Sequence, residues 1–248
     1  MTRNRTAKVV AEIRGLNYHK GDIEETSKAR TILKYAHESA AGLLESFAAV
    51  RAQRGASRGT TTDKEQDLLR ACLIFAAAGL DSTLKQLIRD ALPSLIRRSP
   101  EVKDGLEEFV RRQIRGEEDA GEAAIGRKFL AKILTADNQL DELIEQYILN
   151  LTGSSLQSAA ELAKAANALG VKPGDVGVDP RSLKPIFGDR NKMIHELDIK
   201  LSAPTRNRES RARERIIENA NVLLEIGERI IGAVEDNLAE RHGRREGT

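Results

Sequence analysis

Three polar side chains in the segment 185–201 have the types and spacing that proton transfer and phosphate binding require. Arg190 and Asn191 are consecutive, and His195 follows four residues after Asn191. An imidazole exchanges protons near neutral pH, and a guanidinium can hold two phosphate oxygens at once. On a helix Asn191 and His195 share a face, whereas Arg190 lies about 140° round from His195. Arg190 instead falls on the apolar stripe of the segment, where its charge needs a partner.

A carboxylate inside the most apolar part of the chain is a second candidate. Asp81 lies in the run 67–88, which is rich in leucine, isoleucine and alanine. One interpretation is a buried carboxylate that positions Arg190 or His195. The other is an ion pair with Lys85, one helical turn further on. Asp81 is therefore predicted as a supporting residue of the site, with both interpretations open.

Arginine is also concentrated just after this segment. Arg208, Arg211 and Arg215 fall on one face of a helix predicted at about 207–240. Such a face is suited to follow an RNA backbone, because phosphate contacts supply affinity that does not depend on base sequence. The alternative is the solvated start of a helix, where the helix dipole disfavours cations.

Other kinds of site lack their characteristic residues. No glycine-rich phosphate loop follows a predicted strand, which argues against Rossmann and P-loop nucleotide sites. The four histidines are scattered without the spacing of a metal site. The single cysteine, Cys72, excludes a disulfide within the chain and any zinc site built on several cysteines. We therefore expect no metal and no cofactor.

The elements that must position these residues are helices. Apolar residues recur at spacings of three and four, and the alternation typical of strands is absent, so we predict an all-α helical bundle. A capping box, Thr62-x-x-Glu65, opens the segment predicted as the central core helix, which we expect to end at Pro93. The predicted helices span about 22–52, 62–93, 100–115, 121–135, 137–151, 154–169, 180–198 and 207–240.

The stretch 51–62 has glycines and small polar residues without an apolar anchor, which is typical of a linker. It separates an N-terminal helical extension and linker (1–61) from a helical domain (62–240), which a basic tail (241–248) follows.

Composition limits the class of protein further. The chain carries 40 Lys and Arg against 38 Asp and Glu, which argues against binding by overall charge. Aromatic residues make up only 3%, which argues against platforms that stack nucleic-acid bases. No continuous apolar run approaches about 18 residues, and the N-terminus lacks the apolar region of a signal peptide. We expect a cytoplasmic protein without a membrane partner.

The motif Arg190-Asn191-Lys192-Met193-Ile194-His195 resembles the signature of the HEPN superfamily, in which an arginine, often followed by a polar residue, shortly precedes a histidine. As in that family, the motif precedes a final long helix. The run 67–88 looks like an early core helix of the RiboL-PSP-like HEPN branch. The resemblance covers about 62–240.

This resemblance implies a helical bundle and a metal-independent endoribonuclease. Such enzymes activate the RNA 2′-OH to attack the adjacent phosphate, which leaves a 2′,3′-cyclic phosphate. By resemblance, His195 would exchange the proton, Arg190 would hold the phosphate, and Asn191 would orient His195 or donate to a phosphate oxygen. The family builds its site across a homodimer, and its members include toxins and antiviral defence effectors, which implies an antitoxin or regulatory protein partner. The alternative is a non-catalytic helical module that dimerises and binds RNA or protein.

Overall fold

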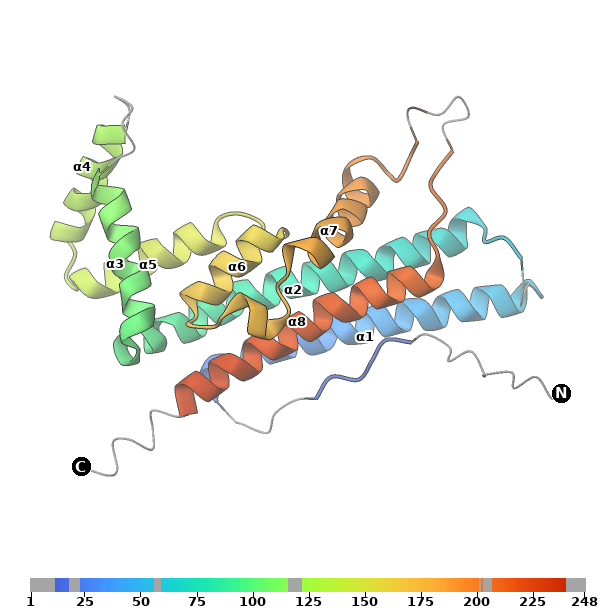
Figure 1. Cartoon of the computed structure of the whole chain (residues 1–248), viewed down its shortest axis with the longest axis horizontal. Helices are drawn as coiled ribbons and strands as arrows, with labels where there is room; N and C mark the ends of the chain where they lie inside the picture. The colour runs from blue at the N-terminus through green and yellow to red at the C-terminus, as the bar shows by residue number, and fades with distance from the viewer. Residues whose placement is uncertain are drawn as a thin grey trace.

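The helical periodicity of the sequence is realised along most of the chain. The computed structural model describes residues 12–17, 23–55, 59–115, 122–200, 202 and 207–239. Within these ranges the backbone forms α-helices, one short 3-10 helix and no β-strand, so the all-α prediction is confirmed (Figure 1). The elements are α1 (Glu24–Gln53), α2 (Asp63–Arg98), α3 (Pro100–Arg115), α4 (Glu122–Leu134), α5 (Gln139–Thr152), α6 (Ala159–Ala168), η1 (Pro173–Val176), α7 (Pro180–His195) and α8 (Arg213–Ala239).

Three long helices, α1, α2 and α8, lie side by side and form the body of the bundle (Figure 1). Helix α2 is the central one, because its buried leucines face both α1 and α8 on one side and the shorter helices on the other. Leu73, Leu80 and Leu87 are fully buried, as the apolar character of this segment predicted. Helices α5, α6 and α7 also pack against α2, and α3 and α4 form one end of the molecule (Figure 1).

The predicted N-terminal extension is an integral part of the bundle by its packing. Helix α1 buries Ala29, Leu33, Ala36, Ala40 and Leu44, which recur at helical spacing. These side chains belong to the same hydrophobic core as those of α2 and α8. The basic tail 241–248 lies outside the described residues.

A glycine allows α1 and α2 to approach closely. A Cβ built on Gly79 of α2 would clash with the Cβ of Ala36 of α1. We expect Gly79→Ala to lower the free energy of unfolding by about 1–3 kcal/mol, because the two helices must move apart. Urea unfolding measures this change. Gly42→Ala is the matched control, since a Cβ at Gly42 meets nothing within 4 Å, and equal unfolding midpoints for the two variants would contradict the packing.

The two ends of α2 compare differently with the prediction. The capping box at the start of α2 is confirmed, with the Thr62 hydroxyl accepting from Glu65 N at 3.3 Å and the Glu65 carboxylate accepting from Thr62 N at 2.9 Å. The expected end at Pro93 is wrong, because α2 continues to Arg98. Burial of Leu95 and Ile96 beyond the proline offsets the backbone hydrogen bond that it removes.

By length and composition, α2 is the single helix among the described residues that is able to cross a membrane. In the structure 56% of its most apolar window is buried inside the bundle. Its apolar side chains are therefore used largely for contacts with other helices of the same chain. The buried position of Cys72 on this helix raises the pKa of its thiol to about 12, which keeps the thiol protonated and unreactive.

Candidate functional site

Helix α7 holds the three residues of the motif, and both of its ends are defined by specific interactions. Asp179 caps the first turn, its carboxylate accepting from Arg181 N at 3.2 Å and from Ser182 N at 3.1 Å. These hydrogen bonds hold the pKa of Asp179 below its usual value. The helix ends at His195, not near 198, because Leu197 and Asp198 adopt left-handed backbone angles with φ of 49° and 60°.

The guanidinium of Arg190 is half-buried and lacks a carboxylate partner. Its Nη1 donates to Asn191 Oδ1 at 2.9 Å, and its Nε is buried without a hydrogen-bond partner. Arg190 makes no ion pair with any residue that the structure describes. Burial lowers the pKa of Arg190, and the charge of Asp81 acts in the opposite direction without reversing the shift. An anion from outside the chain would therefore stabilise this cation.

His195, the last residue of α7, is exposed. Within the described part of the chain its ring has no hydrogen bond or ion pair. On a regular helix its side chain lies about 140° round from Arg190 and about 7.5 Å further along the axis. Asn191 is exposed on the same side as His195. In one copy of the chain, Asn191 therefore pairs with Arg190, while His195 points to a different side of the helix.

Asp81 has features of both of its predicted roles. Its Oδ2 lies 3.1 Å from Lys85 Nζ, which is the expected ion pair. Its Oδ1 accepts from the backbone N of Leu156 at 2.6 Å, which fixes the connection between α5 and α6 to the core helix. Asp81 raises the pKa of Arg190 through its charge, although no hydrogen bond joins the two residues in the structure. It is thus a nearby charge and a structural anchor.

The expected basic helix face after the motif is wrong. Helix α8 begins at Arg213, so Arg208 and Arg211 precede it and share no helix face with Arg215. Arg208 forms a backbone bridge with Ile199, and its Nη2 lies 2.7 Å from the carboxylate of Asp67. Arg215 Nη2 lies 2.8 Å from the carboxylate of Asp189. Each of the three arginines therefore forms an ion pair with a carboxylate of the same chain.

Arg211 is the centre of a buried ion cluster that the sequence did not predict. The cluster consists of Arg70, Asp189, Asp198 and Arg211, each less than a tenth exposed. Arg211 Nε donates to Asp198 Oδ2 at 2.9 Å, and its Nη1 donates to Asp189 Oδ1 at 2.7 Å. Arg70 Nε donates to Asp198 Oδ2 at 3.0 Å. The cluster ties the chain between α7 and α8 to the core helix α2.

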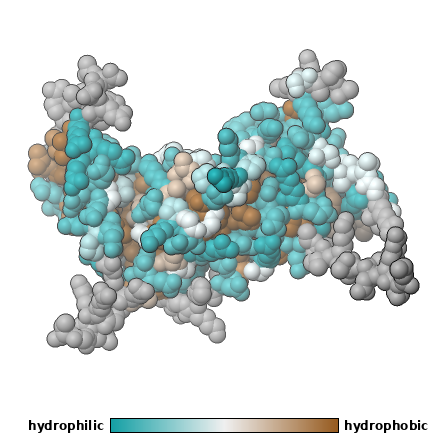
Figure 2. Space-filling view, viewed as in Figure 1, coloured by the Kyte–Doolittle hydropathy of each residue, from teal (hydrophilic) through white to brown (hydrophobic). Residues whose placement is uncertain are grey.

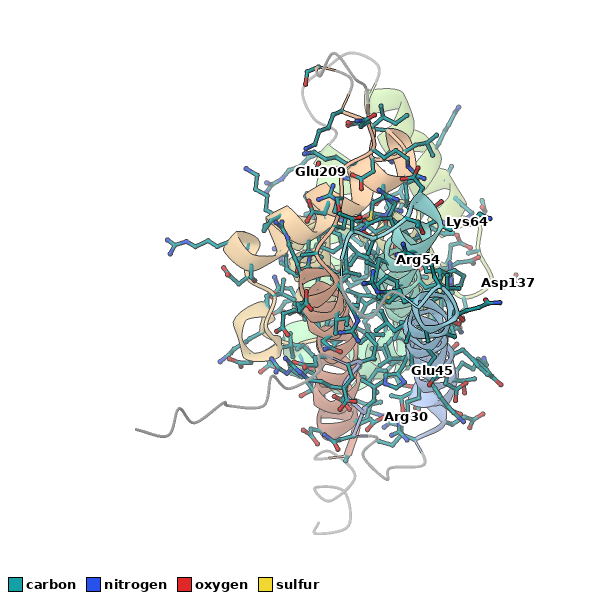
Figure 3. All side chains as sticks on the ribbon, turned by 90° about the vertical axis from the view of Figure 1, so that its right-hand side faces the viewer. Arg30, Glu45, Arg54, Lys64, Asp137 and Glu209 are labelled. Carbon is teal, nitrogen blue, oxygen red and sulfur yellow. The ribbon has the colours of Figure 1, made fainter. Side chains whose placement is uncertain are left out.

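Electrostatics and backbone geometry both fit a structural role for this cluster. Burial opposes ionisation of Asp198, but hydrogen bonds from Arg211 and Arg70 outweigh it and lower the pKa of Asp198. Hydrogen bonds with Asp198 likewise raise the pKa of Arg211. Figure 3 views this end of the molecule, with Glu209 labelled above Arg54 and Lys64. The signal that could have revealed the cluster is Asp189, whose charge falls on the buried side of α7.

A cavity of about 330 Å³ lies beside the end of α7. Its lining mixes two lysines with three carboxylates and therefore favours neither sign of charge. The lining residues are Lys192, Glu196, Asp198, Ile199, Lys200, Ser202 and Glu209.

No group of three or more His, Cys, Asp or Glu side chains in the described ranges is arranged to hold a metal ion. Comparison with family models, with curated proteins and with solved structures found no match to the chain. The interpretation of the site therefore depends on its own residues and geometry, above all on the contrast between Arg190 and Arg211. Arg211 forms ion pairs with three carboxylates, those of Asp189, Asp198 and Glu209, whereas Arg190 has no ion-pair partner within the described chain.

Proposed function

We propose that this protein is a metal-independent endoribonuclease of the HEPN type. In the proposed reaction the RNA 2′-oxygen loses its proton and bonds to the adjacent phosphorus. The bond between phosphorus and the 5′-oxygen of the next nucleotide breaks, and that oxygen gains a proton. The products are a 2′,3′-cyclic phosphate and a 5′-hydroxyl. The observation that carries the proposal is the half-buried, uncompensated guanidinium of Arg190 on the helix that also carries the exposed His195.

Each side chain has a chemical role in this proposal. Arg190 binds the non-bridging oxygens of the phosphate and stabilises the charge that develops on them. His195 exchanges a proton with the attacking or the leaving oxygen. The carbonyl oxygen of Asn191 accepts from Arg190, so this residue orients the guanidinium rather than His195, and its amide group is left to donate to a phosphate oxygen.

A second copy of the chain completes the proposed site. Arg190 and His195 point to different sides of α7, so one copy does not bring both onto one phosphodiester. A twofold-related pair of chains can place Arg190 of one copy opposite His195 of the other. Leu197, which follows the motif directly, is 61% exposed and offers apolar surface for such a contact. The proposed active species is therefore a homodimer with RNA as its substrate.

The cellular role that we propose follows from the resemblance of the motif to the HEPN superfamily. A ribonuclease of this type acts in the cytoplasm as a toxin or an antiviral defence effector. Its activity would need restraint by an antitoxin or a regulatory protein.

The second candidate function is a helical module that dimerises and binds RNA or protein without catalysis. The observation that favours it is the apolar surface at the end formed by α3 and α4 (Figure 2). Leu130 and Leu134 of α4 are 36% and 69% exposed there. A non-catalytic module would bind its partner equally well with or without His195, whereas cleavage requires His195.

Arg190→Met tests the proposal because it predicts opposite changes in activity and stability. We expect the rate of RNA cleavage in EDTA to fall by about 10²–10³-fold, since one group that stabilises the developing charge is lost. We expect the free energy of unfolding to stay equal or to rise, because a half-buried charge without an ion-pair partner is removed. Cleavage is followed on labelled RNA, with the cyclic phosphate identified by mass spectrometry, and unfolding is followed in urea.

Arg211→Met is the matched control, since it leaves the carboxylates of Asp189 and Asp198 buried without their main partner. It should lower the stability strongly. Cleavage at the wild-type rate by Arg190→Met, or a strong loss of stability in that variant, would contradict the role proposed for Arg190.

A further inference from the structure

One exposed face of α7 carries four polar residues and a glycine along its length. Lys184, Gly188, Asn191, Lys192 and His195 are all exposed. At 100° per residue they fall within a sector of about 100° around the helix axis. We call these five residues the basic face of α7.

The two lysines of the basic face carry positive charge that no ion pair in the described chain offsets, although Lys192 also lines the cavity that contains Glu196, Asp198 and Glu209. Lys184 and Lys192 make no ion pair with any residue in the part of the chain that the structure describes. Between the ends of α7 the acidic residue is Asp189, which is buried and already paired with Arg211 and Arg215. Exposed acidic groups stand only at the two ends of the helix. Asp179 acts on Arg181 at the start, and Glu196 follows the last turn.

Gly188 lies in the middle of this face, where no packing contact within the described chain requires a glycine. Glycine destabilises a helix interior relative to alanine, so it usually marks a close approach of another group. Such an approach exists at Gly79, against Ala36, and at Gly227, where a Cβ would lie 3.0 Å from Leu33 Cδ1. A Cβ at Gly188 would meet nothing within 4 Å. Gly188 therefore leaves the backbone of α7 open to a group from outside the chain, as Gly42 does on α1.

We infer that the basic face of α7 binds the sugar–phosphate backbone of a single-stranded RNA, which approaches the helix most closely at Gly188. Lys184 and Lys192 contact phosphates on either side of this point, and the strand then passes His195 of the same face and Arg190 of the second copy in the proposed dimer. The charge favours a phosphate backbone over direct packing against a second copy of the chain, since two cationic surfaces repel unless an anion lies between them. In the proposed dimer the RNA is that anion. The inference builds on the proposed ribonuclease function, but binding is measurable without cleavage.

The first test compares two charge-removing variants in binding to a fluorescent 2′-O-methyl RNA, which lacks the attacking hydroxyl and stays intact. We expect Lys184→Ala/Lys192→Ala to weaken binding roughly tenfold or more. The slope of log affinity against log salt should shrink by about 1.4, or about 0.7 for each lost phosphate contact. Arg112→Ala/Lys128→Ala, which removes two exposed cations from α3 and α4 away from α7, should leave both values unchanged (Figure 1).

The second test uses the glycine. Gly188→Gln adds an uncharged side chain that favours the helix, so the midpoint of thermal unfolding should be unchanged or higher. Affinity for the same 2′-O-methyl RNA should fall roughly tenfold, because the added side chain keeps the backbone away from the helix. Unchanged affinity in Gly188→Gln, or equal losses in the two charge-removing variants, would overturn the inference. Loss of dimer with unchanged RNA affinity would assign the face to a second copy instead.

These outcomes are separable from failure of the proposed function. If the wild type binds 2′-O-methyl RNA through the basic face but cleaves no unmodified RNA, the binding surface stands and the ribonuclease proposal falls. If the wild type cleaves RNA and the Lys184→Ala/Lys192→Ala and Gly188→Gln variants bind as well as the wild type, the ribonuclease proposal stands and the inference about the basic face falls.

Discussion

Replacing His195 with alanine is expected to reduce the rate of RNA cleavage by about 10²–10⁴-fold, which is the usual contribution of a positioned acid–base group. The fold should be unaffected, because the ring is exposed and makes no hydrogen bond or ion pair within the described chain. Cleavage is measured under single-turnover conditions in EDTA, and folding by circular dichroism. Binding of 2′-O-methyl RNA should change far less than the rate, since the phosphate contacts of α7 remain.

His37→Ala is the matched control for this prediction. His37 lies on α1, where its Nε2 pairs with the backbone oxygen of Arg14 at 2.9 Å, and it has no role in the proposed chemistry. Its cleavage rate should equal that of the wild type. Added imidazole should partly restore cleavage by His195→Ala, because the small molecule supplies the missing proton-transfer group. Cleavage by His195→Ala at the wild-type rate would remove the histidine from the mechanism.

Replacing Asp198 with asparagine is expected to lower the free energy of unfolding by about 3–5 kcal/mol, because it leaves Arg70 and Arg211 buried without their shared carboxylate. The Asp198 side chain is only 1% exposed, and both arginines donate to it. Urea unfolding at neutral pH measures the loss. Asp137→Asn is the control, since Asp137 is exposed and should change stability by less than about 0.5 kcal/mol.

The same prediction has a defined pH dependence. The folded protein holds the pKa of Asp198 below its value in the unfolded chain. The stability that this carboxylate contributes is therefore fully present above the unfolded value of about 3.9 and is lost as the pH falls through the lower folded value. The difference between wild type and Asp198→Asn should shrink below about pH 4. A difference that stays constant down to pH 2 would contradict the buried ion cluster.

Most of the helical architecture was predictable because it depends on local sequence. Apolar spacing located α1 and α2, and the hydroxyl and carboxylate of the capping box marked the start of α2. The errors occurred where tertiary contacts determine the path of the chain or the end of a helix. Pro93 did not end α2, because the following turn is buried.

The chain between α7 and α8 was predicted least well, since distant residues determine its path. Its backbone is held by Asp198, which accepts hydrogen bonds from both Arg211 and Arg70, the latter on α2 and 128 residues away. No local pattern distinguishes Arg211 in this buried cluster from an exposed arginine on a helix. The prediction that Arg208, Arg211 and Arg215 share one helix face was wrong for this reason.

The candidate site was predictable in its residues and not in its electrostatics. Residue types and spacing selected Arg190, Asn191 and His195. The sequence also indicated that Arg190 would lie on the buried side of α7. It did not indicate that Arg190 would lack a carboxylate while Arg211 has three, because that depends on which segments pack against α7.

The central claim is that Arg190 of one copy and His195 of another act on the same phosphodiester, and subunit complementation tests it most directly. Purified Arg190→Ala and His195→Ala proteins, each inactive alone, are mixed under conditions that allow exchange of subunits, and RNA cleavage is measured in EDTA. We predict recovery of about a quarter of the wild-type activity, because half of the dimers are mixed and each mixed dimer regains one of two sites. A mixture in which mixed dimers form and cleavage stays absent would contradict the claim.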